Sequence, residues 1–432
     1  MKTLKITSLD GIKRLNQQLS RQSAFAPKEQ AKVAAILGQV RRGGDKALLA
    51  LAKRLDGFSG SAKDLRLSKA AVTAAYGKVD KAFLKALDNA IANVQAYQSR
   101  LIPRSWRAHL RPGVLLGQRV RPIQRVGIYV PGGAAPLVST VVMTAVPAKV
   151  AGVPQLILAS PARQGAGIDA RIIVAAHRAG VQEILCVGGA QAIAAMAYGT
   201  KSIAPVDKVV GPGNRWVTMA KQQVFGTVGI DMLAGPSEAL VLADDSAPVE
   251  WVAADLLSQA EHAGDETAVL VTPSTRLVAA IKKALEAQLK ALPRRSIAAA
   301  SLKKHGLIIL TKDMGQAVAV ANAIAPEHLQ LMVRNAEKVL PRITAAGAIF
   351  MGPYTPVALG DFLAGPSHVL PTGGSARFSN GLSVEDFVTK SSIVSYSRQA
   401  LSQTMSDLEQ VGGAEGLQAH VRSGSIRLKE RA

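Results

Sequence analysis

The 432-residue chain has one cysteine, Cys186, and only 4% of its residues are aromatic. A single cysteine excludes a disulfide within the chain, which is typical of a protein from a reducing compartment. Cys186 lies in the apolar run of residues 184–187, so we expect a small buried residue rather than a nucleophile.

The sequence also lacks long apolar runs. No stretch of about twenty uninterrupted apolar residues occurs, and a transmembrane helix needs roughly that length. The first ten residues, MKTLKITSLD, do not contain the apolar segment of a secretory signal. We therefore expect a cytoplasmic protein without a membrane partner.

Acidic residues are few: 30 Asp and Glu stand against 52 Lys and Arg, a net charge of +22. Residues 1–125 hold 25 of the basic and seven of the acidic residues. A basic surface is one property of nucleic-acid-binding proteins. Here the basic residues are scattered singly, without an RNP-type aromatic string, paired zinc-finger cysteines or a dense basic run. The pattern favours a solvated basic face over nucleic-acid binding, which is kept as an alternative function.

Hydrophobic residues make up 48% of the chain, which is long enough for two or more domains. Residues 3–100 show apolar residues at helical spacing, and Ser8 could cap a first short helix. From residue 125, short apolar strands alternate with helices, which predicts parallel, doubly wound sheets. The expected strands are residues 126–130, 155–159, 183–187, 208–211 and 229–233, then 239–243, 268–271, 306–310 and 348–351.

We predict an α/β protein with two doubly wound, Rossmann-like lobes, a helical N-terminal segment and a helical C-terminal tail. The N-terminal segment is residues 1–25. The first lobe combines 26–125 with 236–382, because the helices before residue 125 would complete the second series of strands. The second lobe is 126–235, and the tail is 383–432.

Three glycine-rich turns follow expected strands of the second lobe, at residues 131–133, 188–191 and 211–214. None is a strict G-x-G-x-x-G motif. Glycine permits positive φ and close backbone approach, and the helix that follows can direct its N-terminus at a phosphate. Each turn alone is equally well explained by chain reversal. Three in one lobe make dinucleotide binding a comparable explanation, since ligands of open α/β sheets lie at the carboxyl ends of the strands.

Gln259 and His262 lie three residues apart near the end of a helix expected over residues 248–262, and so project from one side of it. An amide oxygen and an imidazole nitrogen could together hold zinc, although glutamine is an uncommon ligand. The pair alone is explained as well by a polar helix end that faces water.

The adjacent Glu327 and His328 precede the apolar residues 329–333. A carboxylate and an imidazole at a strand start could divide acid–base work, although the dipeptide alone favours an exposed loop pair. Asp361 and His368 bracket a Gly-Pro-Ser turn, and Glu415 precedes His420 by five residues.

Seven motifs together closely resemble the histidinol dehydrogenase family, over residues 30 to 425. They are GIYVPGG, GGAQAIAA, VGPGN, AGPSE, DLLSQAEH, APEHL and GPSHVLPT. The resemblance implies an NAD-dependent, zinc-containing homodimer that oxidises L-histidinol to L-histidinaldehyde and then to L-histidine, the last steps of histidine biosynthesis.

The resemblance also implies residue roles. Glu327 would activate the water that attacks the aldehyde, and His328 would accept the proton of the substrate hydroxyl. The implied zinc ligands are Gln259, His262, Asp361 and His420. Substrate contacts would come from these four together with Ser237, His328, His368 and Glu415, and NAD contacts from Tyr129, Gln191 and Asn214.

In the family the amine and imidazole of the substrate bind the metal, so zinc would orient the substrate. The tail would cross to a partner subunit and bring His420 to its zinc, so that active sites are shared. The sequence leaves open whether another metal replaces zinc, and the basic first 125 residues depart from the family pattern. Another alternative is a dehydrogenase of a different small polyol, such as a sulfonated propanediol. Glu415 argues against it, because a carboxylate complements an ammonium group and repels a sulfonate.

Overall fold

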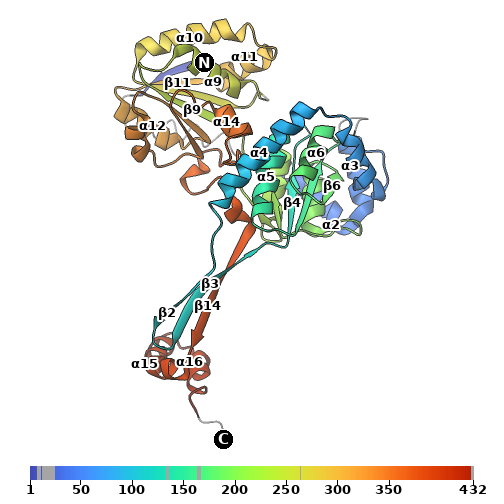
Figure 1. The fold of residues 1–432 in the computed structure, drawn as a ribbon, viewed down its shortest axis with the longest axis vertical. Coiled ribbons are helices and arrows are strands. Elements are labelled where there is room, and N and C mark those ends of the chain that lie inside the picture. The colour runs from blue at the N-terminus through green and yellow to red at the C-terminus, as the bar shows by residue number, and fades with distance from the viewer. Residues whose placement is uncertain (7–10, 12–24, 133–135, 163–166, 263, 430–432) are drawn as a thin grey trace.

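The structure, a computed structural model, describes residues 1–6, 11, 25–132, 136–162, 167–262 and 264–429. Two α/β lobes lie beside each other, and a long arm projects away from both (Figure 1). The predicted α/β class with two parallel sheets is confirmed. Among the described helices, none is both long and apolar enough to cross a membrane.

The five-stranded lobe contains a parallel sheet in the order β6-β5-β4-β7-β8. Its strands are short and almost entirely buried, because helices cover both faces. The strands are β4 (Arg125–Tyr129), β5 (Gln155–Ser160), β6 (Glu183–Cys186), β7 (Lys208–Val210) and β8 (Gly229–Ile230), and the crossover helices are α5 (Val138–Val150), α6 (Ala170–Arg178), α7 (Gly189–Tyr198) and α8 (Arg215–Val224).

The helices that precede β4 pack on this same lobe. They are α2 (Pro27–Asp56), α3 (Lys69–Tyr76) and α4 (Lys81–Ser99), with a 3-10 turn at Ala62–Leu65. α2 lies along α7 and α8, while α4 packs on α5 and α3 on α6. Assigning residues 26–125 to the other lobe was therefore wrong: the apolar faces of these helices enter the same core as β4 and α7.

The six-stranded lobe is also parallel, in the order β1-β11-β10-β9-β12-β13. Its strands are β1 (Lys2–Lys5), β9 (Glu238–Ala243), β10 (Thr267–Thr272), β11 (Leu307–Leu310), β12 (His328–Met332) and β13 (Ala348–Met351). Its helices are α9 (Val249–Ala260), α10 (Thr275–Leu289), α11 (Arg295–Lys304), α12 (Met314–Ile324), α13 (Ala336–Val339) and α14 (Val357–Phe362). α9, α10 and α11 share one core with the sheet, and α12 lies in the core of the other face.

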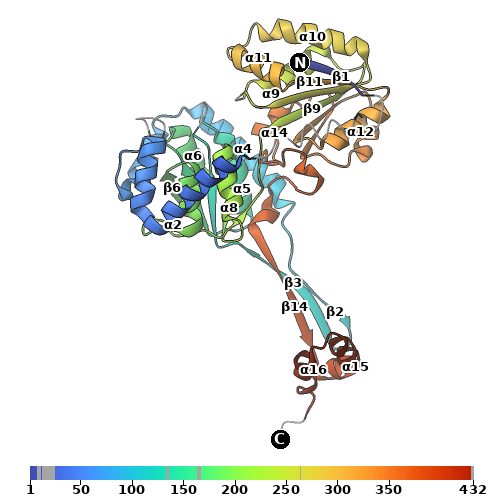
Figure 2. The same ribbon diagram turned by 180° about the vertical axis from the view of Figure 1, so that it is seen from behind.

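Residues 2–5 differ from the helical segment expected over residues 1–25, of which residues 7–10 and 12–24 lie outside the described residues. Residues 2–5 form the edge strand β1, which pairs in parallel with β11, and buried Ile6 follows it (Figure 2). The short segment gains a row of backbone hydrogen bonds along the sheet edge, which outweighs a weak helical pattern. Ser8, the expected helix cap, lies outside the described residues.

The arm begins with an antiparallel sheet in the order β14-β3-β2, formed by β2 (Trp106–Arg111), β3 (Val114–Pro122) and β14 (Val388–Tyr396). α15 (Arg398–Ala414) and α16 (Gln418–Ser425) form its far end, where the chain terminates (Figures 1 and 2). The tail thus ends in helices as predicted, but its first part is a strand. β14 pairs along its whole length with β3, which belongs to the stretch before residue 125.

Candidate active site

The expected acid–base pair lies at the amino-terminal edge of the six-stranded sheet. His328 is the first residue of β12, directly after Glu327, and β12 lies between β9 and β13. Only 6% of Glu327 and 4% of His328 are exposed. The interpretation as an exposed loop pair is therefore wrong, because a strand inside the sheet carries both residues into the interior.

Two donors hold the carboxylate of Glu327. Its Oε2 accepts a hydrogen bond of 2.5 Å from Ser237 Oγ and one of 2.9 Å from the backbone N–H of Glu238. Burial raises the pKa of Glu327, while His328 and these two donors oppose the rise. The group is thus fixed in position and has an increased affinity for a proton.

The backbone of Glu238 also fixes the ring of His328. His328 Nδ1 lies 3.1 Å from the carbonyl oxygen of Glu238. A carbonyl can only accept, so Nδ1 carries a hydrogen and donates it. The other ring nitrogen, Nε2, lies 3.5 Å from Asp361 Oδ1 and points toward the rest of the site. Burial lowers the pKa of His328, but the carboxylates of Glu327 and Asp361 outweigh that effect and raise it to about 9.

Asp361, in the last turn of α14, stands among three histidines. Burial would raise its pKa, but the hydrogen bond and charge of His328 and the charges of His368 and His262 lower it overall. The structure therefore brings together residues from four separate segments that the sequence left apart. His368 also reaches the five-stranded lobe, since its Nε2 lies 3.4 Å from Thr140 Oγ1 of α5. The site thus lies where the lobes meet.

Gln259 and His262 approach this group from the end of α9. Gln259 is buried, and its Nε2 has no hydrogen-bond partner among the described residues. His262 Nδ1 lies 3.2 Å from the carbonyl oxygen of Ser258 and must donate to it, which leaves Nε2 free as a ligand. Histidines that bind metals have this arrangement, and a helix C-terminus favours a nearby cation. The donors fit zinc, although among the described residues no three His, Cys, Asp or Glu side chains are grouped as a metal site.

His420 and Glu415 are not near these residues within the chain. His420 lies in α16, and Glu415 follows α15, so both belong to the far end of the arm (Figure 1). Both side chains are exposed. One chain alone therefore provides three of the four expected zinc ligands at the sheet edge.

The expected cofactor residues lie at the carboxyl-terminal edge of the five-stranded sheet. Tyr129 ends β4, and its hydroxyl accepts a hydrogen bond of 3.1 Å from the N–H of Gly189. Burial raises the pKa of Tyr129 to about 12, so the phenol keeps its proton and can donate it. Gln191 is buried in the first turn of α7, and its Nε2 donates to Asp56 Oδ2 at 3.0 Å. Glycine is required at position 189, where φ is +59°.

Asn214 is the N-cap of α8 and accepts hydrogen bonds from the N–H groups of Trp216 and Val217. The turn before it is held at Gly211, whose N–H donates to Asp231 Oδ2 at 2.7 Å and whose carbonyl accepts from Lys221 Nζ at 3.0 Å. Lys221 and Asp231 also form a buried ion pair. A Cβ at Gly211 would collide with the carbonyl of Tyr129, so this turn lies directly against the end of β4.

Sequence reasoning missed several residues that shape these sites. They are Asp56, Thr140, Lys221, Asp231 and Glu238. Thr140 lies inside an apolar helix pattern, Glu238 ends the motif AGPSE just before an expected strand, and Asp56 ends a helix that we had assigned to the other lobe. Cys186 is buried, as expected, and burial raises the pKa of its thiol to about 11.

Comparisons with known proteins agree with this geometry. The histidinol dehydrogenase family model matches residues 19–428. Histidinol dehydrogenase of Halalkalibacterium halodurans is 46% identical over 93% of this chain and 94% of its own. That of Heliobacterium mobile is 47% identical, over 92% and 93% of the two chains. The crystal structure of histidinol dehydrogenase from Elizabethkingia anophelis matches with a TM-score of 0.94 at 36% identity, over 99% of this chain and 98% of that one.

A family match over nearly the whole chain, close relatives of the same length and a superimposable solved structure agree with one another. The chain belongs to the histidinol dehydrogenase family of NAD- and zinc-dependent oxidoreductases, and it acts in the last step of histidine biosynthesis.

Proposed function

We propose that the enzyme oxidises L-histidinol to L-histidinaldehyde and then to L-histidine at the edge of the six-stranded sheet, with two NAD molecules as hydride acceptors. The observation that supports this most directly is the connected group of Ser237, Glu327, His328 and Asp361, in which Glu327 and His328 are buried. It contains a proton acceptor and a separate carboxylate, which the two steps respectively require.

Gln259, His262 and Asp361 would hold zinc, together with His420 of the partner subunit. Zinc, when bound, provides a Lewis-acidic centre that takes the amine and imidazole of the substrate and orients its hydroxyl. The ring orientation of His262 supports this assignment, and Gln259 would bind the metal through Oε1, because its NH2 group only donates. His368 and Ser237 would contact the substrate from the remaining sides.

In the first oxidation, the neutral form of His328 accepts the hydroxyl proton of histidinol through Nε2 while hydride passes to NAD. Because the pKa of His328 is raised to about 9, this form increases as the pH rises toward 9. Its Nδ1 stays bonded to the carbonyl of Glu238, so only Nε2 is free to react. In the second oxidation, Glu327 removes a proton from the water that attacks the aldehyde carbon. Ser237 and Glu238 hold the carboxylate in one orientation for that task. A second hydride then leaves for NAD, and the carboxylic acid is released.

NAD would bind at the carboxyl edge of the five-stranded sheet through Tyr129, Gln191 and Asn214. Three observations support this: the residues lie on adjacent turns, the turns need glycine at 189 and 211, and Thr140 connects this lobe to His368. Ligands of open α/β sheets bind at this edge.

The arm supports a homodimer with shared sites. Large apolar side chains are exposed along it, including Trp106 at 50%, Leu110 at 63%, Val394 at 67% and Val411 at 62%. Surfaces of this kind are usually covered in a protein–protein interface. His420 and Glu415 lie on the same arm, so docking on a second chain would bring both to its zinc site. There the carboxylate of Glu415 would pair with the ammonium group of the substrate.

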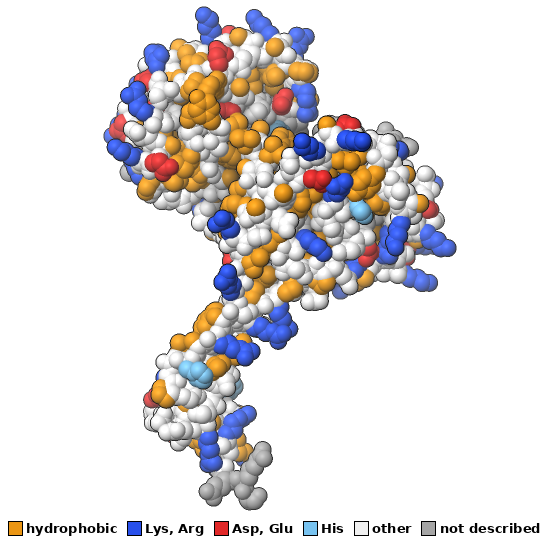
Figure 3. All heavy atoms as spheres, viewed as in Figure 1, with side chains coloured by type: hydrophobic (Ala, Val, Ile, Leu, Met, Phe, Trp, Pro, Cys, Tyr) orange, Lys and Arg blue, Asp and Glu red, His pale blue; other side chains and the backbone are white. Residues whose placement is uncertain are grey.

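A nucleic-acid role receives little support. On the face shown in Figure 3, Lys and Arg side chains are spread singly over both lobes and the arm. A stripe of basic residues would be needed to follow a phosphate backbone.

Counting NADH formed per histidinol consumed tests the proposed function. Two NADH for each histidinol, with histidine as the product, are expected. One NADH with accumulated aldehyde would restrict the enzyme to alcohol oxidation, and no NADH with histidinol but turnover of another polyol would favour that alternative.

A further inference from the structure

Asp56, the last residue of α2, reaches across to the start of α7. Its Oδ2 accepts a hydrogen bond of 2.9 Å from the backbone N–H of Gly188 and one of 3.0 Å from Gln191 Nε2. α2 packs along α7, so this contact joins the two helices at the cofactor edge of the sheet. None of the seven family motifs includes Asp56.

The chemistry of the contact fixes the amide of Gln191. An amide group has a donor end and an acceptor end, whereas an ionised carboxylate only accepts. Gln191 must therefore turn Nε2 toward Asp56, and Oε1 faces away from it. Without the carboxylate, either end of the amide could take that position.

Two backbone N–H groups of this turn are already hydrogen-bonded within the protein. The N–H of Gly188 is bonded to Asp56, and that of Gly189 to the hydroxyl of Tyr129. A helix N-terminus usually binds an anion through such free N–H groups. Here the chain's own side chains use them, so contact with NAD depends on side chains such as Gln191.

Asp56 is close enough to affect the whole turn electrostatically. Burial is the main cause of the raised pKa of both Tyr129 and Cys186, and the charge of Asp56 adds to it. Burial likewise raises the pKa of Asp56, while the bonds from Gly188 and Gln191 oppose that rise by stabilising the carboxylate.

We propose that Asp56 is a positioning residue of the cofactor site, which holds the amide of Gln191 with Oε1 directed at NAD. This inference rests on the proposed NAD contact of Gln191. NAD offers donors for such an oxygen in its ribose hydroxyls, in the adenine amino group and in the nicotinamide carboxamide.

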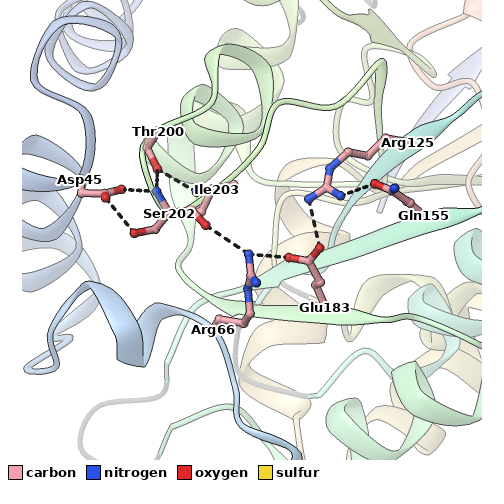
Figure 4. Close-up of polar contacts among 8 residues, drawn as sticks. All are labelled: Asp45, Arg66, Arg125, Gln155, Glu183, Thr200, Ser202 and Ile203. Atoms are coloured by element: carbon pink, nitrogen blue, oxygen red, sulfur yellow. Dashed lines mark hydrogen bonds and ion pairs between the residues drawn. The ribbon is translucent and has the colours of Figure 1, made fainter.

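The same helix supplies a matched control. Asp45 of α2 accepts hydrogen bonds from Ser202, at 3.3 Å from the N–H and 2.8 Å from Oγ (Figure 4). Ser202 lies beyond the C-terminus of α7, so Asp45 binds the opposite end of that helix. Asp45→Ala removes a carboxylate that joins α2 to the same lobe without touching the cofactor turn.

The experiment measures NAD binding by calorimetry in the absence of histidinol, with steady-state kinetics and thermal unfolding beside it. Asp56→Ala should weaken NAD binding by roughly fivefold to tenfold, the loss of about one well-placed hydrogen bond. It should raise KM for NAD and leave kcat nearly unchanged. Asp56→Asn, which can still accept but permits both amide orientations, should fall between. Asp45→Ala should bind NAD like the wild type, even if it unfolds at a lower temperature.

Gln191→Ala and the double variant Asp56→Ala/Gln191→Ala complete the test. If Asp56 acts through Gln191, the double variant should bind NAD no more weakly than Gln191→Ala alone. Losses that add in the double variant, or normal binding by both Asp56 variants, would overturn the inference while leaving Gln191 as a cofactor contact. Normal binding by Gln191→Ala would instead remove Gln191 from the proposed site, and the role of Asp56 with it. Should Asp56→Ala fail to fold, Asp56→Asn decides: binding equal to that of the wild type would overturn the inference.

Discussion

Two sheet edges carry the two halves of the proposed site, and they differ in how far the chain alone completes them. At the carboxyl edge of the five-stranded sheet, the N–H groups of Gly188, Gly189 and Gly211 are all bonded to side chains of the protein. At the amino edge of the six-stranded sheet, the buried Gln259 Nε2 has no hydrogen-bond partner among the described residues, and His328 Nε2 lies 3.5 Å from Asp361 Oδ1.

The difference indicates how each half works. A turn whose polar groups are already bonded is rigid before its ligand arrives, and the ligand adds contacts to a finished surface. A buried polar group without a close hydrogen-bond partner has a free-energy cost that a ligand can relieve. We therefore expect the catalytic edge to depend on metal, substrate and a second subunit, and the cofactor edge to depend on the chain's own packing.

Removing a metal ligand should have the largest effect. His262→Ala should lower turnover by about a thousandfold or more, since a bound metal contributes several kcal/mol to such reactions. The far-ultraviolet circular dichroism should stay unchanged, because each lobe is held by large hydrophobic cores without the metal. Chelation of the wild type should give the same pair of results. Loss of the helical signal in either case would show a structural metal and would contradict the view that the metal serves only the catalytic edge.

Mixing subunits tests whether the catalytic edge is completed by a second chain. His262→Ala and His420→Ala, each inactive alone, are unfolded and refolded together. With arms exchanged, one site of each mixed dimer has both defects and the other has none, so about a quarter of wild-type activity should return for random two-fold pairing. With each arm docked on its own chain, every site keeps one defect, and activity would stay at the level of the separate variants.

Glu327→Gln should separate the two oxidations. Only the second needs a water that has lost a proton, so aldehyde oxidation should fall by about 10²- to 10⁴-fold, the range of general acid–base catalysis. Alcohol oxidation, measured as the first NADH in a single turnover, should fall far less and serves as the internal control. Equal losses in both steps would remove Glu327 from the proposed role.

Lys221→Met addresses the rigidity of the cofactor edge. The change leaves Asp231 charged and buried without its partner, which typically costs about 3–5 kcal/mol of unfolding free energy. Arg178→Ala is the control, because its ion pair with Asp88 is exposed and should contribute less than about 1 kcal/mol. Chemical denaturation would measure both. Equal small losses would mean that the Gly211 turn does not depend on the buried pair.

The smallest effect concerns Asp255, one turn before Gln259 on α9. Burial raises its pKa to about 6, against a hydrogen bond from Gln330 that lowers it. The folded pKa of Asp255 exceeds the unfolded value of 3.8. Its contribution to the free energy of unfolding is therefore fully present below pH 3.8 and is lost as the pH rises through 6. Asp255→Asn should therefore raise Tm by about 2 °C at pH 8 and give no gain near pH 4. An equal change at both pH values would point to packing instead of charge.

Much of the fold could be predicted from hydrophobic alternation. The expected strands at 126–130, 155–159 and 239–243 overlap β4, β5 and β9, because strands buried on both faces are continuous apolar runs. The same patterns do not show which sheet an amphipathic helix will cover. The helix α2 has one apolar face, and only the packed structure shows that this face lies against α7.

Less of the candidate site than of the fold could be predicted from the sequence. The motifs supplied the residues, but an α/β pattern predicts ligands at carboxyl edges, whereas Glu327 and His328 begin a strand at the amino edge. Contacts such as Asp56 with Gln191 span 135 residues and join segments that no local pattern relates. Distances of this kind are set by tertiary packing, which spacing along the chain does not encode.

The strand β1 has a consequence for the order in which the chain folds. Thr3 pairs with Ile308, so β1 is synthesised about three hundred residues before the strand that it pairs with. The five-stranded lobe, whose core strands and helices lie before residue 231, can collapse during that interval, since domains fold as units during synthesis. Strand β1 then joins the six-stranded sheet only after β11 has been made. The strand β1 is short and has a lysine at each end. These charges oppose pairing with the edge of another sheet before β11 is available.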